Sequence, residues 1–123
     1  MAEKRNDQTG RLAGMLGLCA RARGLICGTE LAAQNVRSGK ARIVMVACDA
    51  SENTKKRVFN CCIYYECECR EIPLTASDLA SAVGREGLLT TVAVSDVHMT
   101  KGLRKILDQG EANTPDGPRK AQK

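Results

Sequence analysis

Aromatic side chains are almost absent from this chain. Its 123 residues include no Trp, one Phe and two Tyr, so that aromatic residues make up 2% of the sequence. Many proteins that bind single-stranded nucleic acids stack the bases on aromatic side chains of an exposed sheet. The shortage of aromatic residues argues against that class of binding protein.

Long apolar runs are missing as well. The first ten residues are polar or charged, with no apolar run behind them, so no signal peptide is visible. No run approaches the roughly 18 apolar residues that a membrane span needs. We therefore expect a cytoplasmic protein without a membrane partner. Its length fits one domain and is sufficient to bury a single core.

The sequence also lacks the motifs of common catalytic and metal sites. It has no P-loop, no G-x-G-x-x-G, and a single histidine, His98, which we expect on the surface of the last helix. Cys61-Cys62 and Cys67-x-Cys69 lie close together, but structural zinc sites pair cysteines at C-x₂₋₄-C spacing. Seven cysteines, an odd number in a reducing context, are expected to be thiols rather than a disulfide framework, and free cysteine behaves as a small buried hydrophobic residue. These features predict no enzyme, no cofactor and no metal; a thiol or zinc protein is an alternative that rests on cysteine number alone.

Positive charge is present, and it is concentrated in one half of the chain. The net charge is +5. Residues 1–60 hold eleven Lys and Arg against five Asp and Glu, whereas residues 61–123 hold eight against nine. A one-sided basic balance favours a polyanionic partner. The alternative interpretation is a solvated surface that keeps the protein soluble.

Helical and strand-like patterns alternate along the chain. Helices are predicted at 9–22, 29–38, after a capping box formed by Asp49 and Glu52, after a second one formed by Thr75 and Asp78, and from Asp96 onward. Apolar strands are predicted at 25–27, 43–47, 67–72 and 88–94. This order predicts an α/β fold, a three-layer α/β/α sandwich on a mixed sheet of about four strands. The domain is expected to span 9–108, with a flexible segment at 1–8 and a disordered tail at 109–123.

The stretch from Cys27 to Arg57 carries the clearest functional pattern. Gly28 opens a helix, and a helix start offers free backbone N–H groups and the positive end of a dipole to a phosphate. Gly28 lacks a Cβ and permits close approach, and Thr29 can cap the helix or bond a phosphate. Glu30 can accept from base amino groups, while Gln34 can pair with an adenine edge. Alternatively, Gly28 and Thr29 only start a helix.

Cations near this stretch are expected to contact phosphates. Arg42 could instead be structural, because it stands where a strand begins. Three consecutive basic residues at a helix start are unfavourable beside the positive end of the helix dipole, and an anionic partner would offset this repulsion. The alternative is a solvated run of charge. The candidate phosphate-binding cations are Arg21, Arg23, Lys40, Arg42, Lys55, Lys56 and Arg57.

Three segments together resemble a known family. They are LGLCARARGLICGTEL, RSGKARIVMVACDASENTKKR and LASAVGREGLLTTVAVSD, in that order within residues 11–108. The chain resembles bacterial members of the ribosomal protein L7Ae/L30e family. The resemblance implies an α/β/α sandwich, no catalysis, and binding of kink-turn RNA on the ribosome or on other structured RNA. We expect a monomer when no RNA is bound.

The resemblance also implies two RNA-contacting elements. The first is the start of the second helix, here Gly28, Thr29, Glu30, Leu31 and Gln34. Members that bind kink-turns commonly have a polar pair such as Asn-Glu there, followed by Lys, where this chain has Glu30-Leu31 and Gln34. Because of this departure, a protein–protein adaptor on the same fold stays open as an alternative. The second element is the loop before the last strand, which holds Gly84, Arg85, Glu86, Gly87 and Leu88.

Overall fold

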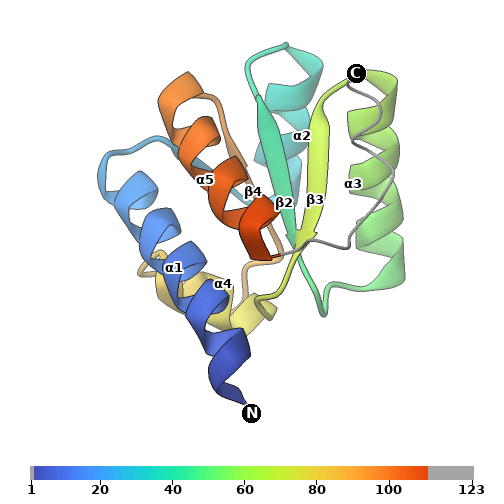
Figure 1. Ribbon diagram of the computed structural model, residues 1–123. Coiled ribbons are helices and arrows are strands. Elements are labelled where there is room, and N and C mark those ends of the chain that lie inside the picture. The colour runs from blue at the N-terminus through green and yellow to red at the C-terminus, as the bar shows by residue number, and fades with distance from the viewer. Residues whose placement is uncertain (1, 111–123) are drawn as a thin grey trace.

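Five helices and four strands alternate within residues 2–110. The structure is a computed structural model that describes the backbone of residues 2–110 and the side chains of residues 9–108. Figure 1 shows the arrangement of these elements. In chain order they are α1 (Ala2–Arg21), β1 (Leu25–Cys27), α2 (Thr29–Arg37), β2 (Ile43–Ala47), α3 (Glu52–Tyr64), β3 (Glu68–Ile72), α4 (Ala76–Ala82), β4 (Thr91–Val94) and α5 (Val97–Gly110).

The sheet is mixed, with strand order β1-β4-β2-β3. β2 and β3 are parallel, and β4 runs antiparallel to both β1 and β2. Strands β1, β2 and β3 therefore all run in one direction. We call the edge at which these three strands begin and β4 ends the strand-start edge, and the opposite edge the strand-end edge. In the view of Figure 1 the strand-start edge is at the top.

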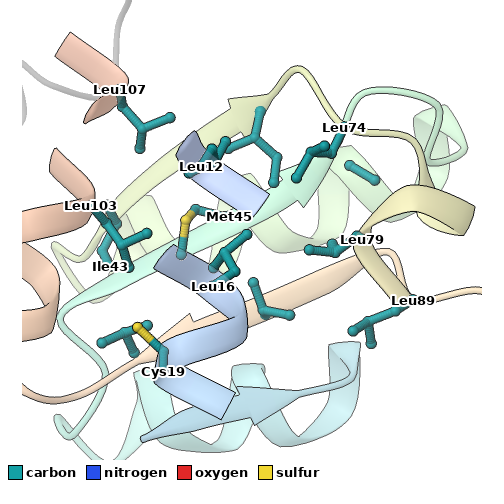
Figure 2. Close-up of a cluster of buried hydrophobic side chains, with 14 of the residues drawn as sticks. Leu12, Leu16, Cys19, Ile43, Met45, Leu74, Leu79, Leu89, Leu103 and Leu107 are labelled. Carbon is teal, nitrogen blue, oxygen red and sulfur yellow. The ribbon is translucent and has the colours of Figure 1, made fainter. Parts of the chain in front are cut away.

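Helices cover both faces of the sheet. On one face α1, α4 and α5 enclose the larger core cluster, in which Leu12 and Leu16 meet Met45, Leu79 and Leu103 (Figure 2). On the other face α2 and α3 enclose a smaller cluster. Every residue of β2 and β4 is buried, as expected for central strands that are covered on both sides. The predicted α/β/α sandwich with a mixed four-stranded sheet is confirmed.

Two of the predicted helix starts are capped as expected. The Thr75 hydroxyl accepts a hydrogen bond from the Asp78 backbone N–H at 3.1 Å. The Asp96 carboxylate accepts from the N–H groups of His98 and Met99, at 2.8 and 3.0 Å. Each side chain satisfies backbone donors that the first turn of a helix leaves without partners.

The capping box predicted at Asp49 is wrong. Ser51 is the residue that caps α3, and its hydroxyl accepts from the Thr54 backbone N–H at 3.1 Å. A turn after β2 delays the helix by two residues, and the Asp49 carboxylate accepts from the Ala76 N–H at 2.8 Å instead. Asp49 thus ties the end of β2 to the start of α4.

Some element boundaries differ from the sequence prediction. α1 begins at Ala2 rather than at residue 9, so the predicted flexible segment is helical from residue 2 onward. β4 begins at Thr91 rather than at Leu88, and α5 continues to Gly110. Of the predicted disordered tail, residues 111–123 lie outside the described residues. No helix within the described residues is long and apolar enough to cross a membrane.

Candidate nucleic-acid interface

Gly28 links β1 to α2 in a conformation that favours glycine. Its φ is 110°, a value that L side chains rarely adopt. Its N–H donates to the Thr91 carbonyl at 2.9 Å, and its carbonyl accepts from the Ala32 N–H at 2.9 Å, which closes the first turn of α2. A Cβ built on Gly28 would meet nothing within 4 Å. The space over Gly28 is therefore open to a ligand.

The start of α2 carries no side-chain cap. The N-cap residue is Gly28, and no side chain in the described part of the chain caps the first-turn N–H groups. Thr29 does not cap, because its hydroxyl lies 3.0 Å from the hydroxyl of Thr91, which is fully buried. This contact anchors α2 to the start of β4. The uncapped N–H groups of the first turn remain available to an acceptor such as a phosphate oxygen.

The loop before β4 lies on the same strand-end edge as Gly28. Gly84 and Gly87 have φ values of 78° and 84°. Between them Arg85 and Glu86 are exposed. The Leu89 side chain is buried, whereas Leu88 beside it is 75% exposed. The structure thus places the two predicted elements, the α2 start and residues 84–88, at one edge of the sheet.

Glu30 and Gln34 lie on the exposed surface of α2, and of the two only Glu30 has a side-chain partner within residues 9–108. The Glu30 carboxylate accepts from the Arg57 guanidinium on α3 at 2.6 Å. This hydrogen bond and the charge of Arg57 lower the pKa of Glu30. Leu31, in the same first turn, is 51% exposed. An ionised acceptor, a free amide and an apolar side chain therefore stand close to the uncapped helix start.

The two lysines at the start of α3 differ in their surroundings. Lys55 donates to the Cys48 carbonyl at 2.9 Å and lies 3.5 Å from the Glu71 carboxylate. These bonds hold β2 and β3 together at their ends, so Lys55 is placed for a structural role. Lys56 is exposed and has no ion-pair partner among the described residues. Only Lys56 of the pair is left to meet a phosphate.

The predicted cations do not form one face, which corrects the sequence interpretation. Arg21 and Arg23 precede β1, and Lys40 and Arg42 precede β2, so all four lie at the strand-start edge. Gly28 and Lys56 follow the same two strands and lie at the strand-end edge. Five residues of strand separate the two edges by roughly 16 Å. The residues before and after each strand are close in sequence, but the strand between them runs from one edge of the sheet to the other.

Four of the seven cysteines, Cys61, Cys62, Cys67 and Cys69, lie together in the smaller core cluster, whereas Cys19 and Cys27 belong to the larger cluster and Cys48 is exposed. Cys62 and Cys69 are buried, and Cys67 beside them is half-buried. A hydrogen bond to the Cys62 thiol, together with burial, raises the pKa of Cys67. No group of three or more His, Cys, Asp or Glu side chains within residues 9–108 is arranged to hold a metal ion. His98 is exposed in the first turn of α5.

Sequence comparisons give this arrangement a family context. The profile of the "Ribosomal protein L7Ae/L30e/S12e/Gadd45 family" matches residues 11–104. A protein from Bacillus subtilis (strain 168), named RNA-binding protein YlxQ, is 34% identical over 94 residues, which are 76% of this chain and 92% of that protein. A protein of the same name from Enterococcus faecium is 44% identical over 71 residues, 58% of this chain and 68% of that one.

Solved structures share the fold. A Bacillus halodurans protein described as having unknown function superposes with a TM-score of 0.74 at 28% identity, over 80% of this chain and 97% of that one. The Giardia lamblia 15.5kD RNA binding protein superposes with a TM-score of 0.69 at 17% identity, over 86% of this chain and 89% of that one. At that lower identity the likeness concerns the fold alone.

Proposed function

The chain belongs to the ribosomal protein L7Ae/L30e/S12e/Gadd45 family, and from this premise we propose that it is a non-enzymatic protein that binds structured RNA through its strand-end edge. The observation that carries the proposal is the uncapped start of α2 beneath the open space over Gly28. The loop 84–88 lies at the same edge. Two relatives bear the name RNA-binding protein, which supports the same ligand.

Each element of this edge has a chemical task in the proposal. The first-turn N–H groups of α2 bind a phosphate or a base carbonyl. Glu30 accepts from base amino groups, and Gln34 pairs with an adenine edge. Leu31 and Leu88 are exposed apolar side chains that pack on bases displaced from a helix. Regular A-form RNA hides its base edges in a deep, narrow major groove, so the proposed ligand is a kinked RNA of the kink-turn type.

The cellular setting is part of the same proposal. A cytoplasmic, ribosome-associated RNA is the ligand that membership of this family favours. An adaptor that binds protein through the same edge is the competing function, and exposed Leu31 and Leu88 favour it, since apolar patches also serve protein partners.

A gel-shift titration with a kink-turn RNA separates the two functions. We expect binding that a straight duplex of the same length does not reproduce. Leu88→Ser should weaken it, whereas Ile63→Ser should not, because Ile63 is comparably exposed, at 61%, but lies in the last turn of α3, away from the strand-end edge. Equal affinity for the kinked and the straight RNA, or equal losses in both variants, would contradict recognition by this edge and leave the adaptor as the better explanation.

A further inference from the structure

Four of the predicted phosphate-binding cations lie at the strand-start edge, which the proposed function does not use. They come from two segments that the fold brings together, the end of α1 with the turn before β1, and the loop before β2. We propose that this edge is a second RNA-binding surface, which contacts the phosphate backbone without reading sequence. The inference rests on the proposed RNA-binding function. The four residues are Arg21, Arg23, Lys40 and Arg42.

The sheet register brings the two segments close together. Val94, the last residue of β4, pairs with Leu25 on one side and with Ile43 on the other. Arg23 stands two residues before Leu25, and Arg42 directly precedes Ile43. Because β1 and β2 flank β4, their starting points are two strand spacings apart, about 10 Å. A short length of RNA backbone can therefore meet both segments at once.

Arg42 is oriented by the main chain of this edge. Its backbone N–H donates to the Val94 carbonyl at 2.8 Å, and its side-chain Nε donates to the Ser95 carbonyl at 3.0 Å. Bonding to backbone carbonyls does not neutralise the guanidinium. The residue that the sequence left open as structural is thus held in place and still charged, so it contributes positive potential at a fixed position.

Arg23 occupies a backbone position where glycine is usual. Its φ is 61°, and it follows the end of α1. Its N–H donates to the Ala20 carbonyl at 3.0 Å, and the Gly24 N–H donates to the Cys19 carbonyl at 2.8 Å, the bonding pattern of a Schellman helix end. A left-handed conformation is costly for a long side chain, and residues that bear such strain concentrate at functional sites. A role in binding explains why an arginine stands there.

Three of the four cations at this edge have no carboxylate partner among the described residues, unlike Lys55 and Arg57 at the opposite edge. Arg21, Arg23 and Lys40 are exposed, and none of them pairs with a carboxylate among the described residues. The strand-end cations Lys55 and Arg57 are paired with Glu71 and Glu30. Unpaired cations bind phosphate without first breaking an ion pair. Arg21, Arg23 and Lys40 are therefore better placed to bind a polyanion than Lys55 and Arg57 are.

Few acidic groups oppose these cations. Asp96 is on the same edge, and hydrogen bonds from the Met99 and His98 N–H groups, together with the charge of Arg42, lower the pKa of its carboxylate. Asp96 therefore stays ionised and offsets part of the Arg42 charge, but it pairs with none of Arg21, Arg23 and Lys40. Glu66 is exposed at the beginning of β3, on the far side of β2. The dipole at the end of α1 explains a cation at Arg21 but not at Arg23 or Lys40, which lie beyond the helix. The residual positive charge is left to attract an external anion.

The test compares a charge-removing variant with a matched control. Arg23→Gly combined with Lys40→Ala removes two charges, and Gly at 23 favours the observed backbone, which protects folding. Lys101→Ala with Lys105→Ala removes the same charge from exposed positions on α5. Binding is measured by fluorescence anisotropy over a salt series, with a kink-turn RNA bearing extended helical arms and with the same RNA trimmed to its kinked core.

We expect the strand-start variant to bind the long RNA about tenfold more weakly at 0.1 M salt, and its log–log salt slope to fall in magnitude by about 1.8, since each lost duplex contact removes about 0.9. Preference for kinked over straight RNA should be unchanged, and the α5 control should match the wild type. Equal slopes for the two variants would overturn the inference while leaving the proposed function intact. A wild-type protein that binds neither RNA would overturn the proposed function itself.

Discussion

The Arg57 guanidinium donates to the Glu30 carboxylate at 2.6 Å and so joins α3 to the start of α2 across the protein surface. The Arg57 and Glu30 side chains are 57% and 68% exposed. The hydrogen bond and the opposite charge lower the pKa of Glu30 and raise that of Arg57, which keeps both groups ionised near neutral pH. Because exposed ion pairs contribute little to stability, the consequence of this pair lies in the orientation of Glu30 beside Gly28.

Replacement of Arg57 by alanine is therefore expected to affect binding more than folding. The melting temperature should change by no more than a degree or so, since the pair is solvated. Affinity for a kink-turn RNA should fall, because Glu30 loses its orienting partner and the edge loses a cation. Calorimetric melting and a gel shift measure the two effects, and Arg57→Lys is the control that retains the charge. A large loss of stability would show that the pair holds the helices together.

Base contacts and phosphate contacts can be distinguished by competition. Glu30→Ala and Gln34→Ala should weaken binding of the kinked RNA more than binding of a scrambled duplex, because a good base-edge contact is worth about 1–3 kcal/mol of discrimination. Lys56→Ala should weaken both about equally, since a phosphate contact carries little sequence information. Equal losses for all three variants on both RNAs would mean that the start of α2 does not read bases.

Lys55, next to Lys56, is expected to contribute to stability rather than to RNA binding. Its ammonium is held by the Cys48 carbonyl and Glu71, so Lys55→Ala should lower the melting temperature where Lys56→Ala does not. The neighbouring lysines thus have separable roles, which thermal melts of the two single variants would reveal.

Binding should also depend strongly on salt. If about four phosphates are neutralised, the slope of log K against log salt is expected near −3.6, owing to counterion release. The unpaired cations at the two edges motivate this value. A titration from low to moderate potassium chloride measures it, and an affinity that stays flat across that range would contradict an electrostatic contribution.

The fold was predictable from sequence because local patterns and tertiary packing agree. The uninterrupted apolar residues of β2 are all buried, and Thr75 and Asp96 cap the helices that they were predicted to open. The capping box at Asp49 failed because its carboxylate has a partner at Ala76, 27 positions away along the chain. A window of four residues contains no information about that partner.

The candidate site was predicted only in part, because spacing in the sequence does not show at which edge of the sheet a residue lies. Gly28 has the special backbone that its position suggested, and the loop 84–88 lies at the same edge. The cations could not be assigned to edges from spacing, because Arg23 and Gly28 are five residues apart in sequence but lie at opposite ends of β1. Strand direction was the missing signal: residues that precede parallel strands share one edge, and residues that follow them share the other.

The thiol cluster should need no metal. Purified, reduced protein is expected to carry no stoichiometric zinc and to keep its melting temperature in a chelator, because Cys62 and Cys69 are buried among apolar side chains as small hydrophobic residues. Elemental analysis and melts with and without chelator provide the measurement. One zinc per chain, with unfolding when it is removed, would show that the cysteines form a structural metal site.

Glycine at position 28 should be required for stability and for binding. Gly28→Ala forces a Cβ onto a backbone with φ of 110°, which is expected to cost about 1–3 kcal/mol and lower the melting temperature by several degrees. The matched control is Gly14→Ala, at an exposed α1 position where a Cβ also meets nothing within 4 Å. That variant should gain about 0.5–1 kcal/mol from helix propensity.

RNA binding by Gly28→Ala and Gly14→Ala shows whether Gly28 is needed only for its backbone conformation or also for close approach of the RNA. Below the melting range of both variants, Gly28→Ala should still bind the kinked RNA more weakly than wild type, because the new methyl group projects into the open space over the α2 start. Gly14→Ala should bind like wild type. If Gly28→Ala loses stability but keeps full affinity, the glycine serves only the turn between β1 and α2, and the RNA does not approach that backbone.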